Sequence, residues 1–221
     1  MELNEVMRTT FSARDYTGEE VPDEVLHDIL DNARFAPSGG NRQGNRVIVV
    51  RDQEMRDQIS KIAEPPAKIY AAQRDAGESP WNTIVPSNVT PQQIEDTPPL
   101  AMLIEPYRNA SVVLVFAVDL RVVASMDKEL DRIGVISGAS IYPFVWNVIL
   151  SARQAGFGGT ITTVPVANEP KVKELLHIPE EYAVSALVPL GKPVKQLTKL
   201  NRKPVEEIAT LRTFDGEPFT I

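Results

Sequence analysis

The amino-acid sequence predicts an α+β fold, in which helices and strands share one domain without regular alternation. The 221 residues suit a single domain, residues 1–221, with a sizeable core. Hydrophobic residues make up 43% of the chain and charged residues 24%, as in ordinary globular proteins. Strand and helix patterns mix without a clean strand–helix–strand repeat, which favours α+β over a doubly wound sheet.

The first half of the chain combines helical patterns with one strand pattern. Residues 2–8 suit a short helix, and residues 21–37 (VPDEVLHDILDNARFAP) favour a longer one. Pro22 fits the first turn of that helix, and an apolar stripe follows at helical spacing until a proline ends it. The stripe consists of Val25, Leu26, Ile29, Leu30 and Ala33. A buried strand is expected at 46–51 and a mostly helical segment at 52–74.

The second half adds strands and one strongly apolar helix. A β-branched strand is predicted at 111–119, and a largely apolar helix is predicted at 133–155, ending at Gly156. This helix is expected to be buried on more than one side, either as a central core helix or as a helix shared with a second subunit. Three further elements, in the order strand, helix, strand, are predicted at 159–163, 168–176 and 182–190.

Residues 75–110 form a long segment without clear periodicity. It contains six prolines and Trp81. A stretch of this length in a compact domain is usually functional or disordered. We interpret it as a lid over a site, with a surface excursion without a role as the alternative; Trp81 then caps a substrate or packs in the interior. The last residues, 211–221, lack periodicity and are expected to pack along the body or along a partner.

The composition excludes several classes of function. The net charge of −7 argues against general nucleic-acid binding, which requires a broad basic surface. The chain has no cysteine and two histidines, so disulfides, cysteine-based zinc sites, iron–sulfur clusters and thiol nucleophiles are excluded. His27 falls on the polar flank of its helix and is interpreted as solvated. No metal site is expected, and any redox centre must come from a cofactor.

Neither a signal peptide nor a membrane span is expected. The start, MELNEVMRTT, lacks an apolar core region, and the longest apolar runs are too short to cross a bilayer. The sequence therefore predicts a cytoplasmic protein.

Four short stretches bring together hydroxyl, guanidinium and glycine groups that suit ligand binding. In an extended segment, Ser12 and Arg14 would project to the same side. The other stretches are PSGGN at 37–41, GFGGTITTVP at 156–165 and KLNRKP at 199–204. Their glycines let the backbone approach a ligand closely. Neither the G-x-G-x-x-G fingerprint nor the Walker loop is present.

Taken in order, these stretches resemble the FMN-dependent nitroreductase superfamily. The shared features are an S-x-R-x-aromatic start, a helix ending in A-P-S-G-x-N-x-Q, a late glycine- and threonine-rich segment, and a terminal G-K-P…R-K-P-x-E-E. The ITTVP segment is most similar to the branch that holds iodotyrosine deiodinase and the flavin-cleaving enzyme BluB. The resemblance covers nearly the whole chain.

The resemblance implies a fold, a cofactor and an assembly. The fold is nitroreductase-like, with a central mixed β-sheet flanked by helices, in an intertwined homodimer with two active sites at its interface. This favours the shared-helix interpretation of residues 133–155. The implied cofactor is FMN, with NADPH or NADH as electron donor and a small molecule as acceptor. The flavin carries the chemistry, so no protein nucleophile is expected.

The same resemblance implies roles for individual residues. Ser12 and Arg14 match residues that contact the FMN phosphate and the pyrimidine side of the ring, and Arg202 matches a phosphate-binding arginine. Thr162 and Thr163 match the stretch near flavin N5. The loop that touches FMN, in many members from the partner subunit, is matched by Ser38, Gly39 and Asn41.

Two positions depart from the family pattern. Thr10 and Phe11 stand where members usually have two basic residues, and Arg8, one turn earlier, is the candidate substitute. The loop also reads Gln43-Gly44-Asn45 where Q-P-W is frequent, which would open the pocket or shape it for a different substrate.

Three functions follow from the resemblance. The first is an FMN-dependent NAD(P)H oxidoreductase that reduces nitroaromatic or quinone-type acceptors in a ping-pong scheme. The second is a reductive dehalogenase or flavin-cleaving enzyme of the same fold, ranked lower because residues 75–110 show no clear match to the Glu, Tyr and Lys set that grips a halotyrosine. The third is a non-catalytic flavin-binding module.

Overall fold

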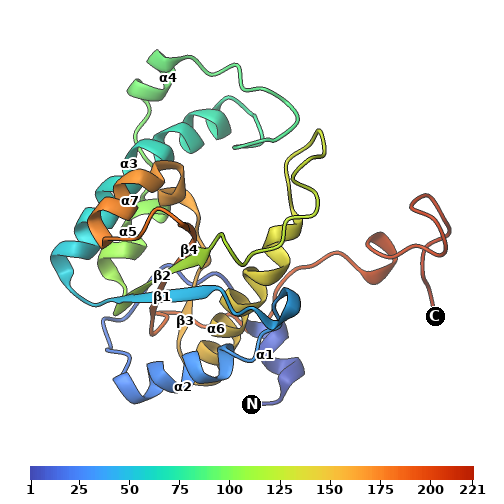
Figure 1. The fold of residues 1–221 in the computed structure, drawn as a ribbon, viewed down its shortest axis with the longest axis horizontal. Coiled ribbons are helices and arrows are strands. Elements are labelled where there is room, and N and C mark those ends of the chain that lie inside the picture. Colours follow the sequence, from blue (N-terminus) through green and yellow to red (C-terminus); the bar gives the residue numbers. More distant parts are fainter.

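The computed structural model describes residues 1–221 and confirms an α+β fold with a central sheet flanked by helices (Figure 1). The four strands are β1 (Asn45–Val50), β2 (Val112–Asp119), β3 (Gly158–Gly159) and β4 (Tyr182–Gly191). They pair in the order β1-β2-β4-β3. All three pairs are antiparallel, so the parallel pair that a mixed sheet requires is not formed within one chain.

The core lies on both faces of the sheet. In β2 all residues from Val112 to Val118 are buried. Alternate side chains point to opposite faces, so Val112, Leu114 and Phe116 enter one cluster while Val113 and Val115 enter the other. This explains why the strand reads as a continuous apolar run. Burial on both faces makes β2 the centre of the domain.

One face of the sheet is covered by α2 (Asp23–Ala33) and α6 (Tyr142–Gln154), with α1 (Leu3–Thr9) beside α6 (Figure 1). The opposite face carries α3 (Gln53–Asp75), α5 (Ala101–Asn109) and α7 (Glu169–Leu176). These bounds confirm the helices predicted at 2–8, 21–37, 52–74 and 168–176. None of the helices combines the length and apolar composition that a membrane span requires.

The helix predicted at 133–155 is shorter than expected. The α-helix begins at Tyr142, and before it come an irregular loop and a 3₁₀ turn, Ile136–Ser140. The buried carboxylate of Asp127 accepts the backbone N–H groups of Val135 at 2.7 Å and Ile136 at 3.3 Å. The predicted end is confirmed, since Gly156 follows the helix with φ +84°.

The segment 75–110 contains more structure than the sequence predicts. It includes α4 (Pro91–Asp96) and α5, and Tyr107 in α5 is 1% exposed. The second half of the predicted lid is therefore part of the core. Between α3 and α4 the chain runs as a loop, where Trp81 is half-exposed, which places it neither in the core nor in a closed site.

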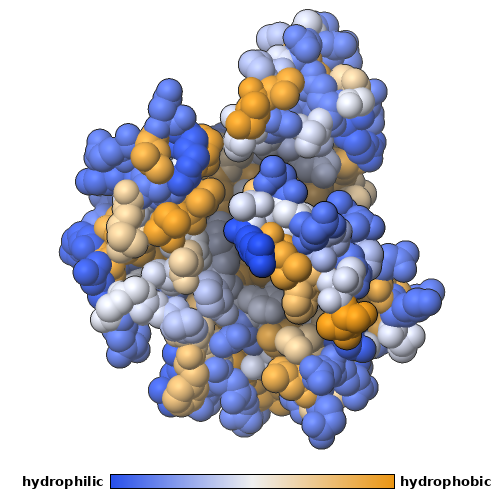
Figure 2. Space-filling model, turned by 90° about the vertical axis from the view of Figure 1, so that its right-hand side faces the viewer, coloured by the Kyte–Doolittle hydropathy of each residue, from blue (hydrophilic) through white to orange (hydrophobic).

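The C-terminal segment extends from the body. After β4 the chain reaches a short 3₁₀ turn, Val205–Glu207, and ends far from the sheet (Figure 1). It presents several exposed apolar side chains: Val205, Ile208, Leu211, Phe214, Phe219 and Ile221. On the side of the molecule where this segment lies, the right-hand side of Figure 1, apolar groups interrupt the hydrophilic surface (Figure 2). The prediction that the tail packs along the body does not hold within one chain.

Candidate functional site

A pocket of about 190 Å³ lies between α3, α5 and the segment that follows β3. Its polar part consists of Arg14, Thr160, Thr162 and Thr163. Its walls are Tyr70, Met102, Leu103, Pro106, Tyr107, Ile161, Val164 and Pro189. The pocket therefore brings together Arg14, Thr162 and Thr163, which the sequence places far apart.

Close backbone packing positions the threonine segment. A Cβ on Gly159 would lie 2.6 Å from the carbonyl oxygen of Pro189, so only glycine fits there without a shift. Three residues later, Thr162 donates its N–H to the Leu187 carbonyl at 2.9 Å and accepts the Leu187 N–H at 2.8 Å. These two bonds fix the backbone of Thr162 on β4, the strand buried in the middle of the sheet.

Arg14 supplies a positive charge to the pocket without a carboxylate partner. Its backbone is anchored by its neighbour Ala13, whose N–H donates to the Gly159 carbonyl at 3.0 Å. The guanidinium makes one hydrogen bond, a long one of 3.4 Å to the carbonyl of Ser12, and forms no ion pair. The pocket lining contains no acidic side chain. An unpaired guanidinium beside hydroxyl groups suits an electron-rich or anionic ligand.

A buried hydroxyl group and a partly buried one meet in the pocket lining. The Tyr107 Oη lies 3.0 Å from the Thr162 Oγ1. Burial raises the pKa of Tyr107 above its ordinary range, so the phenol keeps its proton. The Thr160 Oγ1 is buried without any hydrogen-bond partner in the protein. A buried hydroxyl left without a partner is costly, which favours a ligand atom beside it.

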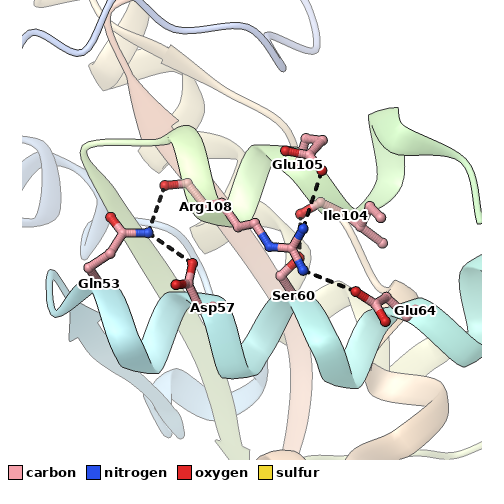
Figure 3. A network of polar contacts seen from close by, with 7 residues as sticks. All are labelled: Gln53, Asp57, Ser60, Glu64, Ile104, Glu105 and Arg108. Carbon is pink, nitrogen blue, oxygen red and sulfur yellow. Dashed lines mark hydrogen bonds and ion pairs between the residues drawn. The ribbon is translucent and has the colours of Figure 1, made fainter.

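The position of Tyr107 depends on how α5 is fastened to α3 (Figure 3). The Ser60 Oγ donates to the carbonyl of Ile104 at 2.9 Å in the buried interface. One turn further on, Arg108 donates to Glu64 at 3.0 Å and to Glu105 at 3.3 Å. Tyr107 lies between these two attachments along α5. These bonds therefore hold the part of α5 that carries Tyr107 in place against α3.

The loop of Ser38, Gly39 and Asn41 lies outside this pocket. It is anchored to the segment before α6, where the Ser140 Oγ accepts the N–H of Gly39 at 2.9 Å. The Ser38 Oγ accepts the N–H of Gln43 at 3.0 Å, and Asn41 has a left-handed φ of 52°. Within one chain the structure does not bring this loop to Arg14, and the roles of its residues stay predictions.

Ser12 and Arg202 also lie outside the pocket lining. Ser12 is exposed, and its carbonyl accepts from Arg14. Arg202 is exposed in the C-terminal segment, and its one hydrogen bond runs to the carbonyl of its neighbour Asn201. Neither residue contacts the pocket in the single chain. The exposed side chain of His27 confirms that it is solvated.

Sequence reasoning missed Tyr107, Tyr70 and Thr160. Tyr107 and Tyr70 lie on helices, and in the sequence an aromatic residue on an apolar helix face cannot be told apart from an ordinary core residue. The contact of Tyr107 with Thr162 joins residues 55 positions apart. Thr160 belongs to the threonine-rich stretch, but nothing in that stretch separates it from its neighbours. The one available signal was the density of hydroxyl groups at 160–163.

Comparison with known proteins agrees with this architecture. An iodotyrosine deiodinase from Nematostella vectensis is 27% identical over 216 residues, covering 96% of this chain and 75% of the relative. An FMN reductase (NAD(P)H) from Bacillus subtilis (strain 168) is 26% identical over 220 residues, covering 96% and 75%. A solved iodotyrosine deiodinase bound to FMN and 3-iodo-L-tyrosine has a TM-score of 0.69 at 21% identity, covering 96% of this chain and 100% of that chain.

The profile of the family described as "Nitroreductase" matches residues 7–192, most of the domain and all of the pocket lining. The match includes the segment from Arg14 to the threonine stretch that the sequence motifs single out. The chain belongs to the nitroreductase family.

Proposed function

We propose that the protein is a cytoplasmic, homodimeric, FMN-dependent NAD(P)H oxidoreductase that reduces nitroaromatic or quinone-type acceptors. The observation that carries the proposal is that the unpaired Arg14 guanidinium and the Thr162 hydroxyl line one pocket with apolar and aromatic walls. Such a pocket suits a flat ring with hydrogen-bond acceptors along one edge.

The residues present fit FMN in chemistry. Arg14 would hold the pyrimidine edge of the ring, where negative charge accumulates on reduction. Thr162 and Thr163 would lie at the central edge, and the partnerless Thr160 Oγ1 offers a further polar contact. When bound, FMN would supply hydride transfer between NAD(P)H and the acceptor. The protein would bind, orient and exclude water.

The size of the pocket supports a dimeric site. About 190 Å³ is less than the roughly 300–1,000 Å³ of most small-molecule sites. The remaining predicted contacts, Ser38, Gly39, Asn41 and Arg202, lie elsewhere on the same chain. A second subunit could bring such groups to the pocket. The apolar C-terminal segment and the exposed Trp146 of α6 offer surfaces for that contact.

The charge of the pocket favours a neutral aromatic acceptor. An amino-acid zwitterion needs partners for its ammonium and its carboxylate, yet the lining has Arg14 and no acidic side chain. Two cations on the nearby helices are paired with carboxylates: Lys68 lies 3.9 Å from Glu95, and Arg108 lies 3.0 Å from Glu64. These charges contribute little to ligand recognition while they remain paired.

Reductive dehalogenation is the second candidate, favoured by the names of the relatives. The deiodinase from Nematostella vectensis matches 96% of this chain. The threonine stretch also resembles that branch. The two candidates differ in substrate: a halotyrosine on one side, and a nitroaromatic or quinone on the other. A non-catalytic flavin-binding module is the third candidate and predicts no turnover.

One experiment separates the candidates. Purified protein is supplied with FMN, and its visible spectrum is followed during anaerobic addition of NADPH or NADH, then of each acceptor. Rapid bleaching by a nicotinamide and recovery with a nitroaromatic or quinone support the proposal. Recovery with 3-iodotyrosine but with neither of the other acceptors supports dehalogenation. Bound flavin that ignores both nicotinamides rejects NAD(P)H dependence, and absence of bound flavin rejects the proposal.

A further inference from the structure

The Tyr107 hydroxyl has one hydrogen-bond partner. The residue is 1% exposed, and the only group that its Oη meets is the Thr162 Oγ1 at 3.0 Å. Buried tyrosine hydroxyls normally satisfy their donor. Either oxygen could donate in this contact, and donation from Tyr107 to Thr162 is the direction that satisfies the buried phenol proton within the protein.

The Thr162 hydroxyl has a second contact that fixes its remaining proton. The backbone N–H of Val164 approaches the same Oγ1 at 3.5 Å. A threonine hydroxyl has two acceptor positions and one proton to donate. When Tyr107 and Val164 occupy the two acceptor positions of the Thr162 oxygen, the Thr162 hydroxyl proton is left to be donated elsewhere. No protein acceptor receives it, and Thr162 lines the pocket.

We propose that Tyr107 is a positioning residue that turns Thr162 into a fixed hydrogen-bond donor to the bound ligand. The proposal rests on the proposed function, in which that ligand is FMN. It also distinguishes the two neighbouring threonines. Thr163 is exposed and its hydroxyl has no hydrogen-bond partner, so nothing orients it. Thr162 is the one whose direction is set by the fold.

The arrangement is rigid on both sides. The backbone bonds to Leu187 hold Thr162, and the attachments of α5 to α3 at Ser60 and Arg108 hold Tyr107. A donor held in place in this way needs no reorientation when a ligand arrives, so less binding free energy is lost to ordering. Arg14, a donor-only group, lies in the same lining. The polar side of the pocket therefore presents donors to the acceptor edge of a ring.

The test compares FMN binding by Tyr107→Phe and Tyr16→Phe. Both tyrosines are buried, and the Tyr16 hydroxyl donates to the carbonyls of Ala13 at 2.8 Å and Pro189 at 2.9 Å and makes no hydrogen bond to a threonine. Thermal unfolding without FMN confirms that both variants fold. FMN dissociation constants come from flavin fluorescence quenching, and the visible absorption band of bound FMN reports the polarity around the ring.

Tyr107→Phe is expected to bind FMN about three- to tenfold more weakly than the wild type and to shift the absorption band of the bound flavin. Tyr16→Phe is expected to change neither. Thr162→Val should weaken FMN binding by a similar factor. Adding Tyr107→Phe to Thr162→Val should then cause no further loss, since both changes remove the same donor.

Three results would overturn the role of Tyr107: unchanged FMN affinity in Tyr107→Phe, an equal loss in Tyr16→Phe, or independent effects of the Tyr107 and Thr162 changes in the double variant. In each case the wild type still binds FMN, and the proposed function stands. If the wild-type protein bound no FMN, the proposed function and the role of Tyr107 would fall together.

Discussion

A Cβ on Gly159 would lie 2.6 Å from the carbonyl oxygen of Pro189 and 3.0 Å from the Val188 side chain. Gly159→Ala should therefore separate β3 from β4 and lower the free energy of unfolding by about 1–3 kcal/mol. Chemical denaturation measures this change. Gly134→Ala is the matched control, because its Cβ would meet its nearest neighbour at an ordinary 3.5 Å and should change stability by less than about 0.5 kcal/mol. Equal stability of the two variants would contradict the packing argument.

Removal of either proposed FMN-binding arginine should weaken flavin retention. Arg14→Ala and Arg202→Ala are each expected to reduce FMN affinity by about tenfold to a hundredfold, since each removes a charge-assisted hydrogen bond. Equilibrium dialysis with FMN measures the effect. Arg74→Ala, which breaks an exposed pair with Asp75, is the control and should leave affinity unchanged. If the double variant, with both Arg14 and Arg202 replaced by alanine, kept the wild-type FMN affinity, this site would be rejected.

The position of the Ser38–Asn41 loop allows a complementation test of the dimer. Arg14→Ala and Asn41→Ala chains should each bind FMN poorly as homodimers. When the two are co-expressed with different affinity tags, the mixed dimer should recover one intact site. This follows because the loop lies outside the Arg14 pocket of its own chain. FMN content of the doubly purified mixed dimer is the measurement, and no gain over the homodimers would contradict a shared site.

The loop before α6 should weaken in acid. The Val135 N–H is the main cause that lowers the pKa of Asp127 to about 2. In the unfolded chain an aspartate has a pKa of about 3.9. Because the folded pKa is the lower one, the carboxylate stabilises the fold above pH 4, and this contribution is lost as the pH falls toward 2.

Asp127→Asn should therefore lower the melting temperature at neutral pH and flatten its fall between pH 4 and pH 2. Thermal scans across that range measure both effects. Asp131→Asn, at an exposed position of the same loop, should behave like the wild type. An acid profile of Asp127→Asn that matches the wild type would reject a stabilising role of the carboxylate.

Most regular elements could be predicted from local pattern. The apolar stripe of α2 and the continuous apolar run of β2 identify both, because each pattern records burial directly. The start of α6 was missed, although Pro143 in its first turn is a typical start signal. Apolar residues continue before it through Ile133, Val135 and Ile136, where the Asp127 carboxylate accepts the Val135 N–H and a 3₁₀ turn follows. Pattern alone does not contain that contact.

The site was predicted in part. Resemblance to a known family brought Arg14 and Thr162 together, and the structure places both in one pocket. Tyr107 could not be found in this way. Its contact with Thr162 depends on how α5 docks on α3, and the prolines around α5 suggested a loop where the chain forms a helix.

The attachment of α5 to α3 also bears on how this protein could diversify. The chain between Asp75 and Ala101 is held at both ends by helices that are fastened to each other through Ser60 and Arg108. Insertions or substitutions between those ends cost little chain entropy and leave the fastened helices in register. The segment can therefore change in sequence and length while the hydroxyl pair of Tyr107 and Thr162 stays in place. Sequence change in this loop is thus separated from the pocket lining, which contains no residue between 76 and 100.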